Sequence, residues 1–431
     1  MSRPTVFVNA RLLDPASGLD TVGGLLVVDG RIADLGPRVR EAIAPDGAET
    51  VDARGHCLAP GLVDLRVQLG EPGAEHKERI DSGAAAAAAG GVTSMAVLPN
   101  TDPPIDEPAM VEFVARRARQ VKLGKVYPYA AVTKRLEGQE LAEIGLLKAA
   151  GAVAFTDGER ALANARVMRR ALAYARNFDA LIVQHPEEPA LAEHGLMNEG
   201  ALASRLGLAG IPVAAEAIVV ERDLRLLELT GGRLHVAHVS TAEAIAAIRA
   251  AKARGLRVTC DTAPHYLALN ELEVEGYRTF AKVSPPLRAE TDRRAVVEGL
   301  KDGTIDVIAS DHCPQDQDSK RLPFAQAAFG VIGVQTMLPV CLRLLHEGEL
   351  DLLALLAKMT CAPARILGLE AGRLAKGAPA DLVLFDPETP WKVTEAALLS
   401  LSKNTAFEGR LVEGRVVRTL VDGRTVYAHG A

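Results

Sequence analysis

The middle of the chain repeats one pattern, in which a short apolar run ends in polar residues and an Ala/Leu-rich segment of helical period follows. Each repeat predicts one buried strand and one helix. The eight runs are VDLRVQL from Val63, TSMAVLP from Thr93, VYPYAAV from Val126, AVAFTDG from Ala152, ALIVQHP from Ala180, LHVAHVS from Leu234, RVTCDTAP from Arg257 and DVIASDH from Asp306. Eight such units predict a (β/α)8 barrel of the TIM type. A doubly wound open sheet is the alternative fold. It agrees less well with these eight repeats, because it normally has fewer strands and a Gly-rich first turn.

One segment shows how the helices are delimited. TAEAIAAIRAAKARG has Ser240 or Thr241 as its expected N-cap and Gly255 at its expected end. We therefore predict a helix between these residues.

The two ends of the chain have a different pattern. Short β-type runs with Asp-Gly turns at Asp29 and Asp422 predict strands joined by hairpins. The runs are FVNARLL, GGLLVV and RIADLG near the N-terminus, and ADLVLFD and GRLVEGRVVRTLVDGRTVYA near the C-terminus. We predict a small composite β-sandwich domain made of residues 1–57 and 371–431, around a barrel of residues 58–370.

Composition narrows the class of protein. The chain of 431 residues has 48% hydrophobic residues and a formal charge of -6, so it can bury a large core and has no basic excess for nucleic acid. No stretch reaches the roughly 20 apolar residues of a membrane helix, and the N-terminus lacks a signal-peptide pattern. Five widely spread cysteines indicate neither a disulfide framework nor a cysteine zinc site. We expect a cytoplasmic protein without a nucleic-acid or membrane partner.

Polar residues gather at the predicted strand ends, where the active sites of such barrels lie. His185, His238, Asp157 and Asp311 supply the nitrogen and oxygen donors that zinc prefers. The same aspartates can equally serve as turn formers, and His265 as a packed structural residue. The full set at these ends is Arg66, Gln68, Asn100, Asp157, His185, His238, His265 and Asp311.

Long collinear motifs give the chain a family resemblance. They are PGLVDLRVQLGEPGAEHKERIDSGAAAAAAGGVTSMAVLPNTDPP, FTDG at Phe155, QHPEEP at Gln184, HVAHVSTAEAI at His235, CDTAPHYL at Cys260, KVSPPLR at Lys282, ASDHCPQ at Ala309 and ADLVLFDP. The chain resembles the type I dihydroorotases of the amidohydrolase superfamily over almost its whole length. The resemblance implies remnant metal ligands at Asp157, His185, His238 and Asp311, and substrate contacts at Asn100 and His265. Asp311 would move the proton in an active member.

Several positions depart from the family pattern. The His-x-His pair expected at the end of the first strand reads Arg66 and Gln68, and the arginine that follows in the family is Gly70. Gln315 stands where a histidine is expected, and Ser284 where the pattern has asparagine. Arginine has no lone pair for a metal, so we expect Arg66 to pair with Asp311 or Asp157 and at most one zinc to bind.

Three functions follow from these observations. The first is a non-catalytic dihydroorotase homologue that acts as a structural partner of aspartate transcarbamoylase in pyrimidine biosynthesis. The second is an active dihydroorotase, which hydrolyses dihydroorotate to N-carbamoyl-aspartate with an atypical single-zinc site. The third is a related cyclic amidohydrolase for hydantoins or allantoin, which would need the same missing histidines. The resemblance also implies a homo-oligomer.

Overall fold

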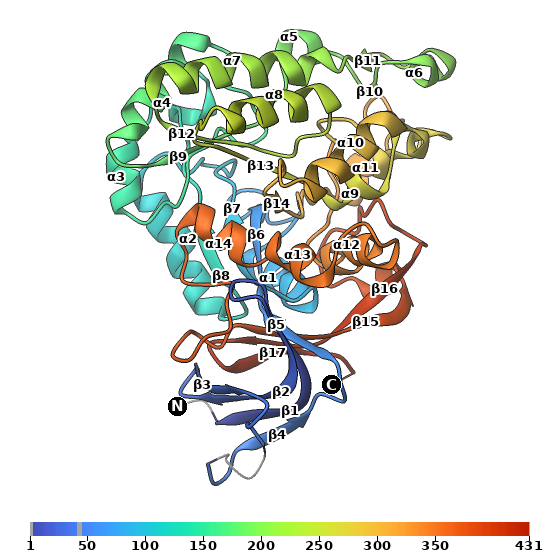
Figure 1. Ribbon diagram of the computed structural model, residues 1–431. Helices are drawn as coiled ribbons and strands as arrows, with labels where there is room; N and C mark the ends of the chain where they lie inside the picture. The colour runs from blue at the N-terminus through green and yellow to red at the C-terminus, as the bar shows by residue number, and fades with distance from the viewer. Residues whose placement is uncertain (1–2, 41–44, 431) are drawn as a thin grey trace.

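A closed parallel barrel forms the centre of the computed structural model, which describes residues 3–40 and 45–430 (Figure 1). Two parallel sheets supply its wall, in the orders β6-β7-β8 and β9-β12-β13-β14. Phe155 joins them through bridges to Ala130 and Ile182, and Val67 closes the ring by a bridge to His312. The strands are β6 (Leu62–Val67), β7 (Val92–Val97), β8 (Lys125–Pro128), β9 (Leu181–Gln184), β12 (Arg233–Val236), β13 (Val258–Thr262) and β14 (Val307–Ile308). The predicted barrel is confirmed, with its fourth run reduced to single bridges.

Helices surround this wall (Figure 1). The helix predicted after the sixth run is α8 (Ala242–Ala253), in which the Thr241 side chain caps the Ala244 N–H and Gly255 follows the C-cap. The others are α1 (Ile80–Ala89), α2 (Pro108–Val121), α3 (Ile144–Ala149), α4 (Ala165–Arg176), α5 (Pro189–Ala192), α6 (Ala201–Leu206), α7 (Ala214–Thr230), α9 (Pro264–Ala268), α10 (Glu290–Lys301), α11 (Gln317–Lys320), α12 (Met337–His346), α13 (Leu352–Ala357) and α14 (Cys361–Leu367). Within the described residues, no helix is long and apolar enough to cross a bilayer.

Both ends of the chain build one sheet, in the order β17-β16-β15-β5-β1-β2-β3 with β4 beside β1. The central strand β5 (Cys57–Pro60) pairs in parallel with β1 and antiparallel with β15. The other strands are β1 (Thr5–Asp14), β2 (Leu19–Val28), β3 (Arg31–Gly36), β4 (Glu49–Asp52), β15 (Leu382–Lys392), β16 (Leu411–Val421) and β17 (Arg424–Ala428), while a separate small pair is β10 (Met197–Asn198) and β11 (Gly210–Ile211). The predicted composite sheet is confirmed. Its exact boundaries stay a prediction, because β5 spans the expected limit at residue 57.

Apolar packing fixes the barrel in position on the sheet. One large buried cluster joins barrel residues to Val383, Phe385 and Val416 of the terminal sheet. A second cluster takes Leu65, Ala96, Leu181, Val307 and others from successive barrel strands, as expected of a packed barrel interior. The strand ends therefore project polar residues from a rigid support.

Candidate active site at the barrel mouth

A buried ion pair occupies the mouth of the barrel. Arg66, near the end of β6, donates from Nε to Oδ1 of Asp311 at 2.7 Å, and from Nη2 to the Gly158 carbonyl at 3.3 Å. The two side chains are only 3% and 12% exposed. Arg66 therefore pairs with Asp311, one of the two aspartates expected from the sequence.

The histidines continue this pair into a chain of hydrogen bonds. His238 Nδ1 lies 3.2 Å from Asp311 Oδ2, and His238 Nε2 lies 2.8 Å from His185 Nδ1. Because a carboxylate only accepts hydrogen bonds, we assign the proton on His238 to Nδ1, and Nε2 then accepts from His185. Both ring nitrogens of His238 and both oxygens of Asp311 are thus engaged.

Electrostatics favour a neutral His238 beside a charged Asp311. Burial lowers the pKa of His238, and the Arg66 cation lowers it further against the opposing effect of Asp311. Burial alone would raise the pKa of Asp311, but His238 and Arg66 hold it well below its usual range. Asp311 consequently stays a carboxylate at neutral pH.

The backbone at both residues is unusual. His238 and Asp311 have φ values of 37° and 50°, in a region that non-glycine residues rarely adopt. Such conformations persist where surrounding structure fixes them, and they are frequent at functional sites.

Asp157 has partners outside this chain of hydrogen bonds. Its Oδ1 accepts the backbone N–H groups of Val132 and Thr133 at 3.0 and 2.9 Å, and its Oδ2 accepts the Thr133 hydroxyl. These bonds fix the loop after β8. They are contacts between two separate strand ends, so they differ from the local turn that the sequence offered as the alternative role of Asp157.

Gln68 and Asn100 belong to a second polar network. The Gln68 amide donates to Glu159 Oε1 at 2.9 Å, and its carbonyl oxygen accepts from Asn100 Nδ2 at 3.1 Å. The Cys313 thiol donates to the same glutamate oxygen at 3.3 Å. The resemblance assigns Asn100 to substrate binding. In the structure the Asn100 amide donates to Gln68 instead.

At Gly70 the backbone conformation leaves no room for a side chain. Its φ is +60°, and a Cβ built there would lie 2.6 Å from the Ala74 carbonyl oxygen and 2.7 Å from that of Glu78. A side chain at this position requires a different loop path. The arginine that the family resemblance leads one to expect here would not fit on this backbone path.

The remaining predicted residues lie around the same mouth. His265 Nε2 is 3.8 Å from Asp311 Oδ2 and makes no hydrogen bond to the described residues, and burial lowers the pKa of His265 to about 4. Ser284 donates to Glu187 Oε2 at 3.0 Å, and that oxygen lies 3.7 Å from His185 Nε2. Gln315 accepts from Lys77 Nζ at 2.9 Å.

Sequence reasoning missed Glu159 and Glu187. Each follows a predicted ligand by two residues, Asp157 and His185 respectively, so strand-end position was the available signal. Thr133 was also missed. It lies in a loop after a strand end and carries no pattern that separates it from other threonines.

The side chains present do not fit a zinc ion. Tetrahedral zinc needs four donors, or three and water, with free lone pairs. Across residues 3–40 and 45–430, no group of three or more His, Cys, Asp or Glu side chains is arranged to hold a metal. Arg66 also places a fixed positive charge on Asp311. Predicted ligands His185, His238 and Asp311 thus lie together, but as hydrogen-bond partners of one another.

Comparisons with known proteins agree on one family. A family model described as "Dihydro-orotase-like" matches residues 55–244. A dihydroorotase of Pelobacter propionicus is 49% identical over 97% of this chain and 98% of its own length. A dihydroorotase of Anaplasma phagocytophilum is 46% identical over 98% and 94% of the two chains.

Among solved structures, an L-hydantoinase (dihydropyrimidinase) from Arthrobacter aurescens has a TM-score of 0.89 at 26% identity, covering 100% of this chain and 97% of its own. A dihydropyrimidinase from Brevibacillus agri has a TM-score of 0.86 at 22% identity, covering 99% and 95%. The whole fold, including the terminal sheet, is therefore shared with these proteins.

Proposed function

The chain belongs to the dihydroorotase family, and from that premise we propose that it is a non-catalytic member that serves pyrimidine biosynthesis as a structural subunit. The observation that carries this proposal is the buried Arg66–Asp311 pair at the barrel mouth. It puts a permanent cation on the residue that would move the proton in an active member.

The chemistry of Asp311 supports this proposal. A general base works best when its pKa lies near the operating pH. The pKa of Asp311 lies far below that range, and both of its oxygens already accept hydrogen bonds. Ring opening of dihydroorotate, in which water adds across an amide C–N bond, would lack its proton carrier here.

Several positions at the barrel mouth, not Arg66 alone, depart from the family pattern. Gln68 binds Asn100 and Glu159, and Gly70 has a backbone that excludes a side chain. The sequence similarity to the dihydroorotase of Pelobacter propionicus nevertheless extends over 97% of this chain and 98% of that protein. A preserved barrel in which part of the expected site is replaced, and Asp311 is held in an ion pair, suits a protein that acts through contacts, and we propose aspartate transcarbamoylase as its partner.

Compartment follows from the same proposal. All five cysteines are free thiols, and four of them are buried. Free thiols are typical of a reducing interior. We place the protein in the cytoplasm, where the partner enzyme would be available to it.

An active dihydroorotase is the second candidate. The names of relatives 45–49% identical over nearly the whole chain favour it, and taken alone they favour it over the first candidate. His238 also lies within hydrogen-bond distance of both His185 and Asp311. The Arg66 side chain is the feature that this candidate has to accommodate.

One assay separates the two candidates. Purified protein with added zinc is tested for ring opening of dihydroorotate and for ring closure of N-carbamoyl-aspartate, beside an Asp311→Ala variant. We expect the protein and the variant to show the same background rate. Turnover that the substitution abolishes would establish the second candidate and refute the first.

A further inference from the structure

Helix α4 presents a face of unpaired arginines to solvent. Arg166, Arg169 and Arg170 are exposed, and none makes an ion pair or hydrogen bond through its side chain with any residue that the structure describes. The helix contains no Asp or Glu. These three side chains therefore form a basic face without internal counter-charges.

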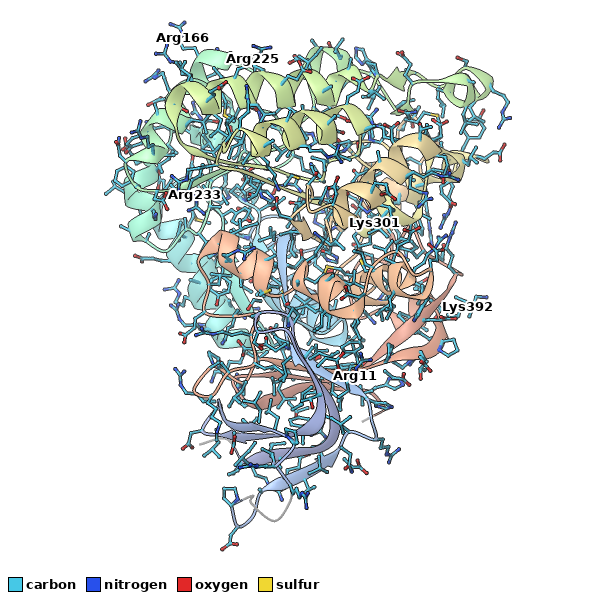
Figure 2. All side chains as sticks on the ribbon, viewed as in Figure 1. Arg11, Arg166, Arg225, Arg233, Lys301 and Lys392 are labelled. Atoms are coloured by element: carbon cyan, nitrogen blue, oxygen red, sulfur yellow. The ribbon has the colours of Figure 1, made fainter. Side chains whose placement is uncertain are left out.

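A fourth arginine, Arg225, lies beside them on α7. Hydrogen bonds between α4 and α7 show how the two helices are aligned. Arg222 of α7 donates to the carbonyls of Leu162 and Ala163 just before α4, and Arg176 at the end of α4 donates to Thr230 at the end of α7. The two helices thus run side by side in the same direction. Arg225, one turn after Arg222, is consequently level with the first half of α4. Figure 2 shows Arg166 and Arg225 projecting from the same edge of the molecule.

Apolar side chains border this basic face on α7. Ile218 and Leu229 are 49% and 65% exposed, one or two turns from Arg225 on the same side of the helix. Glu221 is exposed between them and has no ion pair among the described residues. The surface therefore combines guanidinium groups with accessible apolar contact area. We refer to Arg166, Arg169, Arg170 and Arg225 as the α4–α7 basic face.

The arrangement is unfavourable for the isolated helix. Arg166 is the second residue of α4, where the positive end of the helix dipole disfavours cations. Arg166 is also spaced by three and four residues from Arg169 and Arg170, so like charges face one another along the helix. The whole chain carries a formal charge of -6, so the cluster does not reflect a general basic excess. An external group that supplies negative charge would offset this repulsion.

We infer that the α4–α7 basic face docks an acidic protein surface, and this inference rests on the proposed structural role of the chain. Guanidinium groups form paired hydrogen bonds with carboxylates, and arginine is enriched at protein interfaces. Exposed Ile218 and Leu229 match a protein surface better than a phosphate backbone. The partner to test is aspartate transcarbamoylase, as purified from the same cell.

The experiment compares two charge-reversed variants of the full chain. The first carries Arg166→Glu, Arg169→Glu and Arg170→Glu. Its matched control carries Arg321→Glu, Arg373→Glu and Lys392→Glu, three exposed cations that also lack an ion pair among the described residues. Dissociation constants for the transcarbamoylase are measured at low salt and at about 0.5 M salt, where charge screening is strong.

We expect the first variant to bind about 10- to 100-fold more weakly, mainly through slower association, and the control to bind like the wild type. The melting temperature of the first variant should not fall, because glutamates in the first turns of α4 interact favourably with the helix dipole. A complex that is equally tight in all three proteins would overturn the docking surface and leave the structural role standing.

Three other outcomes count against the inference in different ways. If the wild type forms no complex, the proposed partner fails and this assignment fails with it. If the wild type self-associates and only the first variant is monomeric, the occupant is a second copy of the chain. If a DNA duplex binds the wild type and not the first variant, the face recognises phosphates and the protein partner is wrong.

Discussion

Replacing Arg66 with leucine removes the cation from a buried pair and leaves the Asp311 carboxylate without its counter-charge. The Asp311 side chain is 12% exposed, so water replaces the guanidinium only in part. Breaking such a pair from one side typically costs about 3–5 kcal/mol of folding free energy. We expect a loss of that size for Arg66→Leu in urea unfolding at neutral pH.

Arg11 offers a matched control, because it also lies 2.7 Å from an aspartate, Asp20, but with side chains 43% and 37% exposed. It lies on β1 of the terminal sheet, in the lower part of Figure 2. Arg11→Leu should change the free energy of unfolding by at most about 1 kcal/mol. The double variant Arg66→Leu/Asp311→Leu should recover about 2 kcal/mol, because it removes the uncompensated charge.

The pH dependence gives the same prediction a second readout. In the wild type the pKa of Asp311 lies below the usual 3.8, so the pair stabilises the fold above about pH 4 and this contribution is lost as the pH falls. Without Arg66 that pKa rises. The stability gap between wild type and Arg66→Leu should therefore narrow between pH 7 and pH 4. If Arg66→Leu lowers the free energy of unfolding at pH 7 by less than about 1 kcal/mol, or by no more than Arg11→Leu does, the reasoning from a buried ion pair is wrong.

Three further predictions concern the metal, a buried acid and the loop after the first barrel strand. Excess zinc should leave the melting temperature of the wild type unchanged, whereas it should raise that of the Arg66→His/Gln68→His variant. A zinc-dependent rise of several degrees in the wild type would contradict the conclusion that its side chains do not fit a zinc ion. Burial raises the pKa of Asp64 from 3.8 to about 6. The contribution of Asp64 to the free energy of unfolding is therefore full below about pH 4, and it is lost as the pH rises through 6. Asp64→Asn should flatten that decline, which amounts to about 3 kcal/mol in urea unfolding, and an unchanged slope would exclude the raised pKa. Gly70→Ala should destabilise by about 1–3 kcal/mol through its positive φ and its close approach to Ala74, and a neutral effect would mean that the loop adapts.

Local periodicity was enough to predict the barrel, because each strand needs apolar residues on both faces. The run from Ala152 shows its limit, since only Phe155 of that run makes bridges in the structure. Charge and lone-pair chemistry were enough to predict that Arg66 would pair with an aspartate. Which aspartate it chooses depends on how β6 and the end of β14 meet across the closed ring.

Long-range contacts were beyond local patterns. Glu78 accepts hydrogen bonds from Ser400 and from the Leu401 N–H, and it lies 3.5 Å from His312. Those partners lie far along the chain, in the last part of the barrel and in the C-terminal segment, and no pattern within a few residues of Glu78 predicts them. The backbone of Gly70 likewise depends on the path that the loop takes back to Ala74.

The place of β5 at the centre of the terminal sheet constrains how the protein is made. This strand meets β1 early in synthesis but needs β15, which is translated only after the entire barrel. Until then, one edge of β5 has no partner, and the apolar residues that later meet Val383 and Phe385 stay uncovered on the nascent chain. A ribosome that stalls late would thus release a barrel with a sticky, half-built sheet, a species that chaperones and proteases would be expected to recognise.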